Sequence, residues 1–158
     1  MSFFKKATRK SVKLKLALTG PSGSGKTYSA LKIAKGMGGR IAVLDTENGS
    51  ASLYSHLFDF DVIEMNPPYL TEKYEKAIEA AVQEKYDVLV IDSLSHSWSM
   101  EGGLLEQKEQ LDARGKGNSY TNWAMITKKH EAMKSAILHS PIHVIATMRS
   151  KQDYALIE

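Results

Sequence analysis

The chain has 158 residues, of which 42% are hydrophobic and 25% charged, enough for one globular domain with a continuous core. The absence of cysteine excludes disulfides and thiolate metal sites, and no apolar run reaches the roughly 20 residues of a membrane span. The net charge is +3 and the N-terminus has too short an apolar stretch for a secretory signal, so we expect a cytoplasmic protein with no membrane partner.

Basic residues are concentrated at the start of the chain. The first 44 residues contain ten of the 21 Lys and Arg residues and none of the 18 Asp and Glu residues. We interpret residues 1–12 as a basic arm ahead of one domain over residues 13–158. Such an arm either binds a polyanion or an acidic neighbour, or is simply a solvated tail.

Apolar runs then alternate with helical patterns along the chain. We predict strands over residues 13–19, 40–46, 61–65, 87–92 and 142–148, because mostly continuous apolar runs are typical of strands covered on both faces. Helices are predicted over residues 25–37, 70–85 and 120–138, where apolar side chains recur at helical spacing. The alternation favours an α/β fold with a mostly parallel sheet and helices on both faces.

The strongest functional signal is GPSGSGKT at residues 20–27, between the first predicted strand and the first predicted helix. It matches G-x-x-x-x-G-K-[ST], in which glycines let successive backbone N–H groups surround phosphate oxygens at a helix N-terminus. We expect Lys26 to reach the β and γ phosphates and the Thr27 hydroxyl to bind Mg²⁺. The predicted site for ATP with Mg²⁺ comprises Gly20, Pro21, Ser22, Gly23, Ser24, Gly25, Lys26, Thr27 and Tyr28.

Acidic residues follow two other predicted strands, at the edge where open α/β sheets bind ligands. Asp92 ends the apolar run of DVLVIDS, and we predict that it holds Mg²⁺ opposite Thr27. Asp45 and Glu47 lie at the carboxyl end of the second predicted strand in RIAVLDTENGS, and we predict that Glu47 is the general base for the attacking water. A helix N-terminal acid or a salt-bridge partner is the structural alternative for Glu47. The predicted catalytic residues are Lys26, Glu47 and Asp92.

These motifs resemble the ATPase core of RecA-type recombinases. The sequences GPSGSGKT, IAVLDTEN, VLVIDSLS and IHVIATMRSK carry the resemblance over residues 12–151, and the chain looks most similar to the phage-encoded RecA-like ATPases of the Sak-type single-strand annealing group. The resemblance implies an ATPase of phage DNA recombination or single-strand annealing in the host cytoplasm. It also implies single-stranded DNA, further copies of the chain, and a single-strand-binding protein or other recombination factor as partners.

The resemblance implies roles for individual residues as well. Glu47 matches the glutamate that activates water and Asp92 the Walker B aspartate. Tyr54 matches the tyrosine that stacks on adenine, although a plain core position suits it as well. Thr147 lies at the end of the last predicted strand and Arg149 follows it, at the place where recombinases sense the γ-phosphate. Either Arg149 or the nearby lysine at position 151 is expected to complete a site in cis or in trans.

Residues 93–118 form a long insertion after the fourth predicted strand, with a short helix expected at 104–111. The resemblance implies a DNA-contacting loop here. Cations near aromatic side chains suit single-stranded nucleic acid, and the segment offers Lys108, Arg114 and Lys116 near Trp98. Trp123 lies on the apolar face of its predicted helix, which favours a core position.

Other classes of P-loop protein fit less well. A GTPase is disfavoured because the sequence has neither N-K-x-D nor D-x-x-G after the predicted magnesium strand. A small-molecule kinase, of the nucleoside or nucleotide type, is the alternative to an ATPase. It would need an arginine-bearing lid and an acceptor pocket, and it would lack a water-activating acid at position 47.

Overall fold

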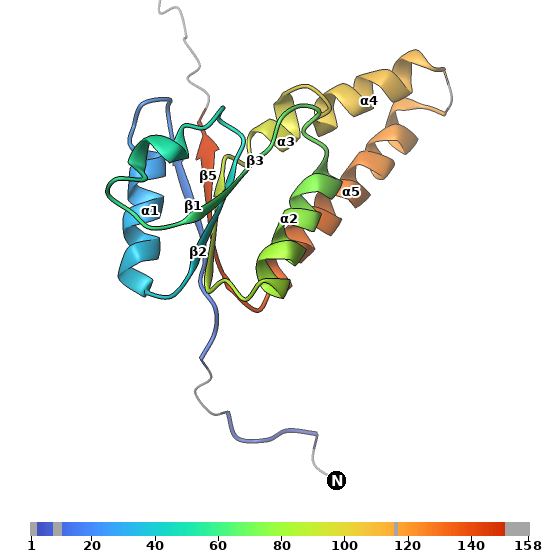
Figure 1. Cartoon of the computed structure of the whole chain (residues 1–158). Coiled ribbons are helices and arrows are strands. Elements are labelled where there is room, and N and C mark those ends of the chain that lie inside the picture. Colours follow the sequence, from blue (N-terminus) through green and yellow to red (C-terminus); the bar gives the residue numbers. More distant parts are fainter. Residues whose placement is uncertain (1–2, 8–10, 116, 151–158) are drawn as a thin grey trace, which may run out of the picture.

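The computed structural model describes residues 3–7, 11–115 and 117–150 (Figure 1). The strands are β1 (Lys15–Gly20), β2 (Ile41–Asp45), β3 (Asp61–Glu64), β4 (Val88–Asp92) and β5 (His143–Arg149). The helices are α1 (Lys26–Met37), α2 (Thr71–Gln83), α3 (His96–Ser99), α4 (Leu104–Ala113) and α5 (Ser119–His139), with a 3-10 helix η1 (Ala51–Tyr54). Each predicted strand agrees with an observed strand to within two residues at either end.

All five strands are parallel and lie in the order β1-β5-β4-β2-β3. Strand β5 therefore separates the strand before the glycine loop from the strand that ends in Asp92. Because parallel strands end at the same edge of a sheet, the residues that follow β1, β5, β4 and β2 lie along one edge. The predicted fold class, an α/β P-loop fold with a parallel sheet, is confirmed.

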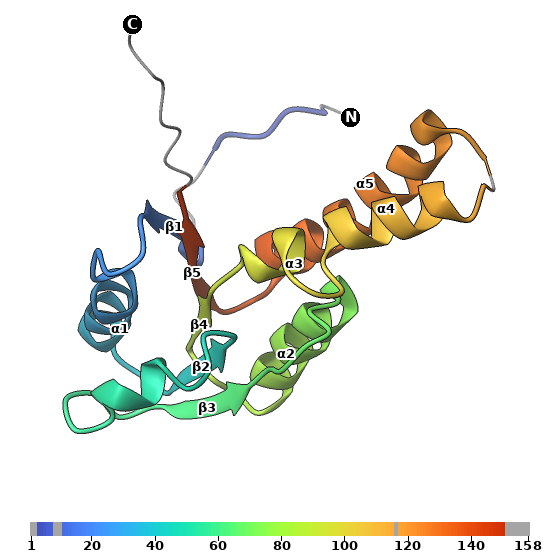
Figure 2. The ribbon, with the colours of Figure 1, turned by 90° about the horizontal axis from the view of Figure 1, so that it is seen from above.

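Helices cover both faces of the sheet, with α1 on one face and α2 and α5 on the other (Figure 2). Helix α1 packs through Ala30, Leu31 and Ala34 against side chains of β2, β4 and β5. The core on the opposite face includes the buried side chains of Leu44, Tyr74, Leu89, Ile91 and Val144. Burial on both faces explains why the strands are almost continuously apolar.

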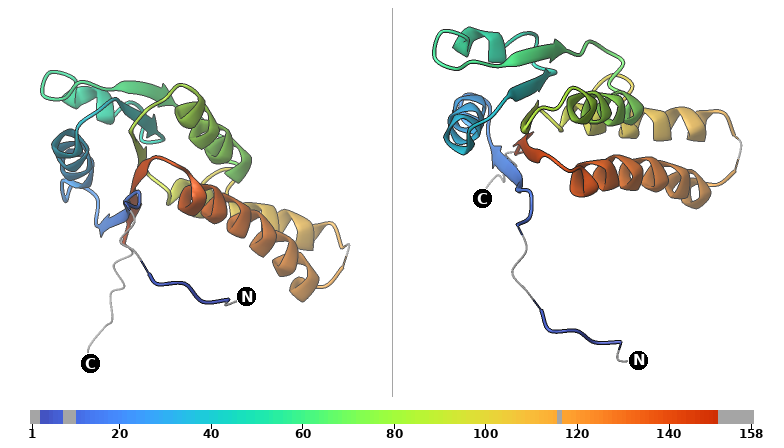
Figure 3. Two further views of the ribbon diagram at one scale, coloured as in Figure 1. Left: turned by 90° about the horizontal axis from the view of Figure 1, so that it is seen from below. Right: turned by 60° about the horizontal axis from the view of Figure 1, so that its bottom comes forward.

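Helices α4 and α5 form an antiparallel pair that extends away from the sheet (Figure 3). The expected short helix at 104–111 is observed as α4, whereas α3 was not predicted. The prediction that Trp123 belongs to the core is wrong: its side chain is 37% exposed. The apolar spacing of α5 is real, with Ile126 and Met133 buried, but its first turns lie beyond the sheet.

The N-terminal segment contributes little regular structure. Residues 3–7 and 11–14 form neither helix nor strand, and the boundary between arm and domain at residues 12 and 13 stays a prediction. Lys116 and Lys151 lie outside the described residues. Across the part of the chain that the structure describes, no helix is both long and apolar enough to cross a membrane.

Candidate nucleotide-binding site

The glycine loop between β1 and α1 forms an open turn. Gly23 and Gly25 have φ angles of 76° and 79°, in the left-handed region that favours glycine. Within the described residues, no side chain caps the N-terminus of α1 and its first turn contains no acid. The N–H groups of this turn are therefore available to an anion, which the helix dipole also favours.

Side chains that were predicted to act together meet beside this loop. The Thr27 Oγ1 donates to Asp92 Oδ2 at 2.6 Å, and the Thr147 hydroxyl donates to Asp92 Oδ1. Asp92 is only 2% exposed. Lys26 Nζ donates to the carbonyl oxygen of Pro21 at 2.7 Å, so the ammonium group lies over the loop. A bound phosphate would offer this ammonium a charged acceptor in place of a carbonyl.

The oxygens of Thr27 and Asp92 fit a magnesium ion. Mg²⁺ prefers hard oxygen ligands and usually combines one or two protein groups with waters and substrate phosphates. Among the described residues, no group of three or more His, Cys, Asp or Glu side chains is arranged to hold a metal. The donor set therefore suits a metal that arrives with a nucleotide rather than one held by protein groups alone.

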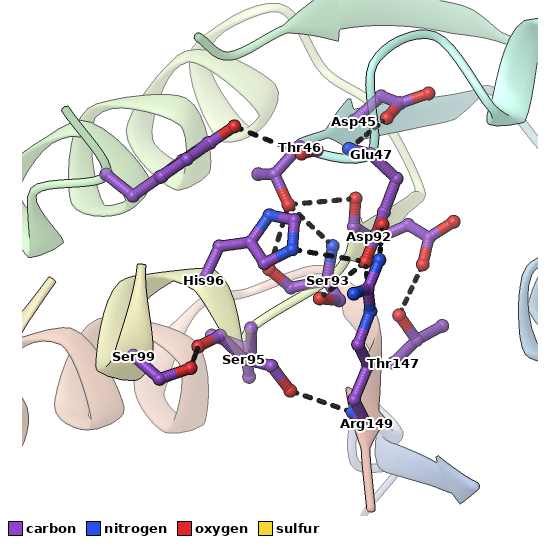
Figure 4. Close-up of polar contacts among 12 residues, drawn as sticks. Asp45, Thr46, Glu47, Asp92, Ser93, Ser95, His96, Ser99, Thr147 and Arg149 are labelled. Carbon is purple, nitrogen blue, oxygen red and sulfur yellow. Dashed lines mark hydrogen bonds and ion pairs between the residues drawn. The ribbon is translucent and has the colours of Figure 1, made fainter. Parts of the chain in front are cut away.

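Glu47 lies in the same pocket and contacts side chains from two other strand ends (Figure 4). Arg149 donates from Nε to Glu47 Oε1 at 3.0 Å and from Nη2 to Oε2. Ser93 Oγ donates to Oε1 at 3.1 Å. The pocket has a volume of about 180 Å³, and its lining comprises Ser22, Gly23, Lys26, Thr27, Glu47, Ser50, Asp92 and Arg149.

Hydrogen bonds between the ends of β2 and β4 position Glu47. The backbone N–H of Thr46 donates to the Asp92 carbonyl at 2.7 Å, and the N–H of Ser93 donates to Thr46 Oγ1 at 2.9 Å. The Asp45 carboxylate accepts two backbone N–H groups of the following turn, one of them from Glu47 at 2.6 Å. Burial raises the pKa of Asp45, and these hydrogen bonds oppose the rise. Asp45 thus shapes the turn that presents Glu47.

The site combines a glycine loop, a buried aspartate opposite the threonine of that loop, and a second acid, Glu47, just after the neighbouring strand β2. A family model described as an AAA domain matches residues 12–156. The chain belongs to this AAA domain family of P-loop ATPases. No curated protein gives a match to the chain. Membership confirms a P-loop ATPase domain over these residues, while the RecA-like and phage annealing parts of the resemblance stay predictions.

Two tyrosines predicted to contact the nucleotide lie together in this AAA domain. The rings of Tyr28 and Tyr54 have centroids 5.9 Å apart, and Tyr28 also lies 5.6 Å from the ring of Phe58. Tyr54 is half-buried and packs against the core between α1 and the sheet. Tyr54 therefore packs against the core, as one of the two alternatives for this residue predicted. The contacts of both tyrosines with a nucleotide stay predictions.

Two residues that lie beside Glu47 in the AAA domain, Ser93 and His96, were not predicted from the sequence as site residues. His96 is 5% exposed, and its ring centroid lies 5.0 Å from that of Tyr69. Burial raises the pKa of the Tyr69 hydroxyl, and the charge of Glu47 adds to the rise. Ser93 was visible as the residue after Asp92 in VLVIDSLS. No sequence pattern distinguishes His96 from the other four histidines, because its position beside Glu47 depends on the fold.

Proposed function

We propose that this AAA domain hydrolyses ATP with Mg²⁺ and couples hydrolysis to single-stranded DNA in recombination or strand annealing. The observation that carries the ATPase part is the meeting of Thr27, Asp92 and Glu47 in one pocket beside the glycine loop. A kinase needs no water-activating acid there, whereas an ATPase does. The position of Glu47 therefore supports transfer of the γ-phosphoryl group to water.

Each pocket residue has a distinct role in this reaction. The loop N–H groups and Lys26 bind the β and γ phosphates, and Thr27 with Asp92 would hold Mg²⁺, which offsets phosphate charge. Glu47 accepts a proton from the water that attacks the γ-phosphorus, so that the products are ADP and inorganic phosphate. Arg149 now neutralises Glu47, and the γ-phosphate of ATP competes with the carboxylate for this guanidinium.

The DNA part of the proposal rests on an exposed pair of tryptophans, Trp98 and Trp123, which we call the aromatic pair. Their side chains are 41% and 37% exposed, with ring centroids 6.4 Å apart and planes inclined by 25°. Lys108 Nζ lies 5.3 Å from the Trp123 ring. Bases of single-stranded DNA stack on such rings while nearby cations pair with phosphates. The RecA-like resemblance supports a DNA contact in the same segment.

The cellular setting of the proposal follows from the same resemblance. We infer a phage-encoded annealing or recombination ATPase of the Sak type, acting in the host cytoplasm as a homo-oligomer with a single-strand-binding protein or another recombination factor. The four RecA-like motifs support this setting. The basic arm suits either role considered for it, contact with DNA or with an acidic neighbouring copy.

One assay tests the proposed function. Inorganic phosphate release from ATP is measured without any acceptor, in the presence and absence of an oligothymidine strand, with Lys26→Ala as the inactive control. Release that needs no acceptor and rises with the strand supports the proposal. Phosphoryl transfer only when a nucleoside or nucleotide is added would support a small-molecule kinase instead. Undiminished ATP affinity of Lys26→Ala in calorimetry would contradict the nucleotide site itself.

A further inference from the structure

The short helix α3 links the candidate catalytic site to the aromatic pair. It spans only His96–Ser99, about one helical turn, and begins shortly after Asp92, the last residue of β4. His96 lies beside Glu47, and Trp98, two residues later, stacks on Trp123. Because both residues belong to the same helical turn, a displacement of Trp98 would also displace His96.

The segment that carries α3 is also attached to the end of β5. The N–H of Leu94 donates to the Thr147 carbonyl at 3.0 Å. The N–H of Arg149 donates to Ser95 Oγ at 2.8 Å (Figure 4). The segment thus contacts Arg149, and through Ser93 and His96 it also lies against Glu47, the partner of Arg149 in the ion pair. Movement of α3 changes the surroundings of the carboxylate and of the guanidinium together.

His96 is held close to a hydrogen bond that it does not make. Neither ring nitrogen has a hydrogen-bond partner among the described residues, although Nε2 lies 3.4 Å from Glu47 Oε1. An unsatisfied buried polar group destabilises the fold, which favours any small movement that satisfies it. A shift of a few tenths of an ångström would bring Nε2 to the ~3.0 Å of an N–H···O bond.

That bond would use an oxygen that Arg149 and Ser93 already occupy. Glu47 Oε1 accepts from Arg149 Nε at 3.0 Å and from Ser93 Oγ at 3.1 Å. A donated hydrogen bond from His96 competes with both. Tyr69 also packs on the imidazole ring of His96, with ring centroids 5.0 Å apart, and so helps to hold that ring beside Glu47.

We propose that His96 is a positioning residue that couples the aromatic pair to Glu47. A base that stacks on Trp98 displaces α3, His96 then donates to Glu47, and Arg149 is released toward the γ-phosphate. The coupling rests on the proposed function, because it regulates the same site. Coupling between two sites is reciprocal, so ATP binding must in turn alter the surroundings of Trp98.

The reciprocal effect gives a test that needs no DNA. The chain has two tryptophans and both belong to the aromatic pair, so all tryptophan emission reports on this surface. We expect ATP with Mg²⁺ to change the emission of the natural protein, and His96→Phe, which keeps a ring against Tyr69, to lose this change. His96→Gln restores an N–H near Nε2 and should recover it. His139→Phe, at the exposed end of α5, is the matched control.

A second readout measures phosphate release with and without oligothymidine. In His96→Phe we expect the ratio of the two rates to fall to unity, while the affinity for labelled oligothymidine stays within about twofold of the natural protein. The same ratio and the same emission change in His96→Phe as in the natural protein would overturn the coupling. So would an ATP-saturated natural protein whose emission does not change. Failure of the natural protein to bind ATP in calorimetry overturns the proposed function, and the coupling with it.

Discussion

Replacing Glu47 with Gln separates the chemical step from folding at this site. The change keeps the size of the side chain and one hydrogen-bond-accepting oxygen, but it removes the group that accepts a proton from water. General bases typically contribute about 10²- to 10⁴-fold in rate, or about 2.7–5.4 kcal/mol of transition-state stabilisation. We therefore expect turnover of Glu47→Gln to fall by this factor, with ATP affinity little changed.

The same change has a small effect on stability. The ion pair between Glu47 and Arg149 is partly open to water, since the arginine side chain is 44% exposed. Such pairs contribute roughly 0.2–1 kcal/mol, and a glutamine oxygen still accepts one bond from Arg149. For a domain of this size, a loss of about 1 kcal/mol lowers Tm by about 2–4 °C. A large loss of turnover with a small loss of Tm thus identifies a catalytic role.

Phosphate release, ATP calorimetry and thermal unfolding on one preparation provide the three measurements. Glu64→Gln is the matched control, because Glu64 also ends a strand at this edge of the sheet but does not line the pocket. Turnover of Glu47→Gln within about threefold of the natural protein would refute the reasoning. Glu47 would then be a structural partner of Arg149, and another group would activate the water.

Three further changes test the site and the fold. Lys26→Ala removes a charged donor to phosphate and should weaken ATP binding by about 10- to 100-fold in calorimetry. Leu31→Ala empties a fully buried position under α1 and should lower the free energy of unfolding by about 2–5 kcal/mol in urea titrations; a loss below ~1 kcal/mol would contradict the packing. Burial, with Lys13 and Lys15 nearby, lowers the pKa of His143. Neutral His143 therefore stabilises the folded protein above pH 6.5, and this contribution is lost as the pH falls through the lower pKa of the folded state. The free energy of unfolding should thus depend less on pH in His143→Asn than in the natural protein. Equal pH dependence of the two proteins would argue against the lowered pKa.

The parts of the fold that the sequence predicts are those with local causes. The strands can be predicted from the sequence because burial on both faces leaves almost no polar residue inside them. The glycine loop can be predicted because its backbone conformation requires glycine at fixed positions. Trp123 shows the limit of this reasoning. Helical spacing tells which face of α5 is apolar, but it does not tell how far that helix extends beyond the sheet.

The contacts of the candidate site depend on strand order, which periodicity does not give. The sequence indicated Asp92, Glu47 and Thr27 individually, because each follows a strand or a glycine loop. It did not indicate that Arg149 pairs with Glu47 across 102 positions of sequence. Nor did it indicate His96, whose contact with Glu47 arises only because β4 lies beside β2.

Strand order together with side-chain length explains which residues of β5 contact which acid. Neighbouring strands lie about 4.8 Å apart, so Thr147, with a short side chain, reaches only Asp92 at the end of the adjacent β4. Glu47 follows β2, one strand further and about 10 Å from β5. Arg149 is long enough to cross that distance and hold the carboxylate from the far side of β4. The strand inserted between β1 and β4 thus lets one cation of β5 contact Glu47 at the edge where the phosphates are expected to bind.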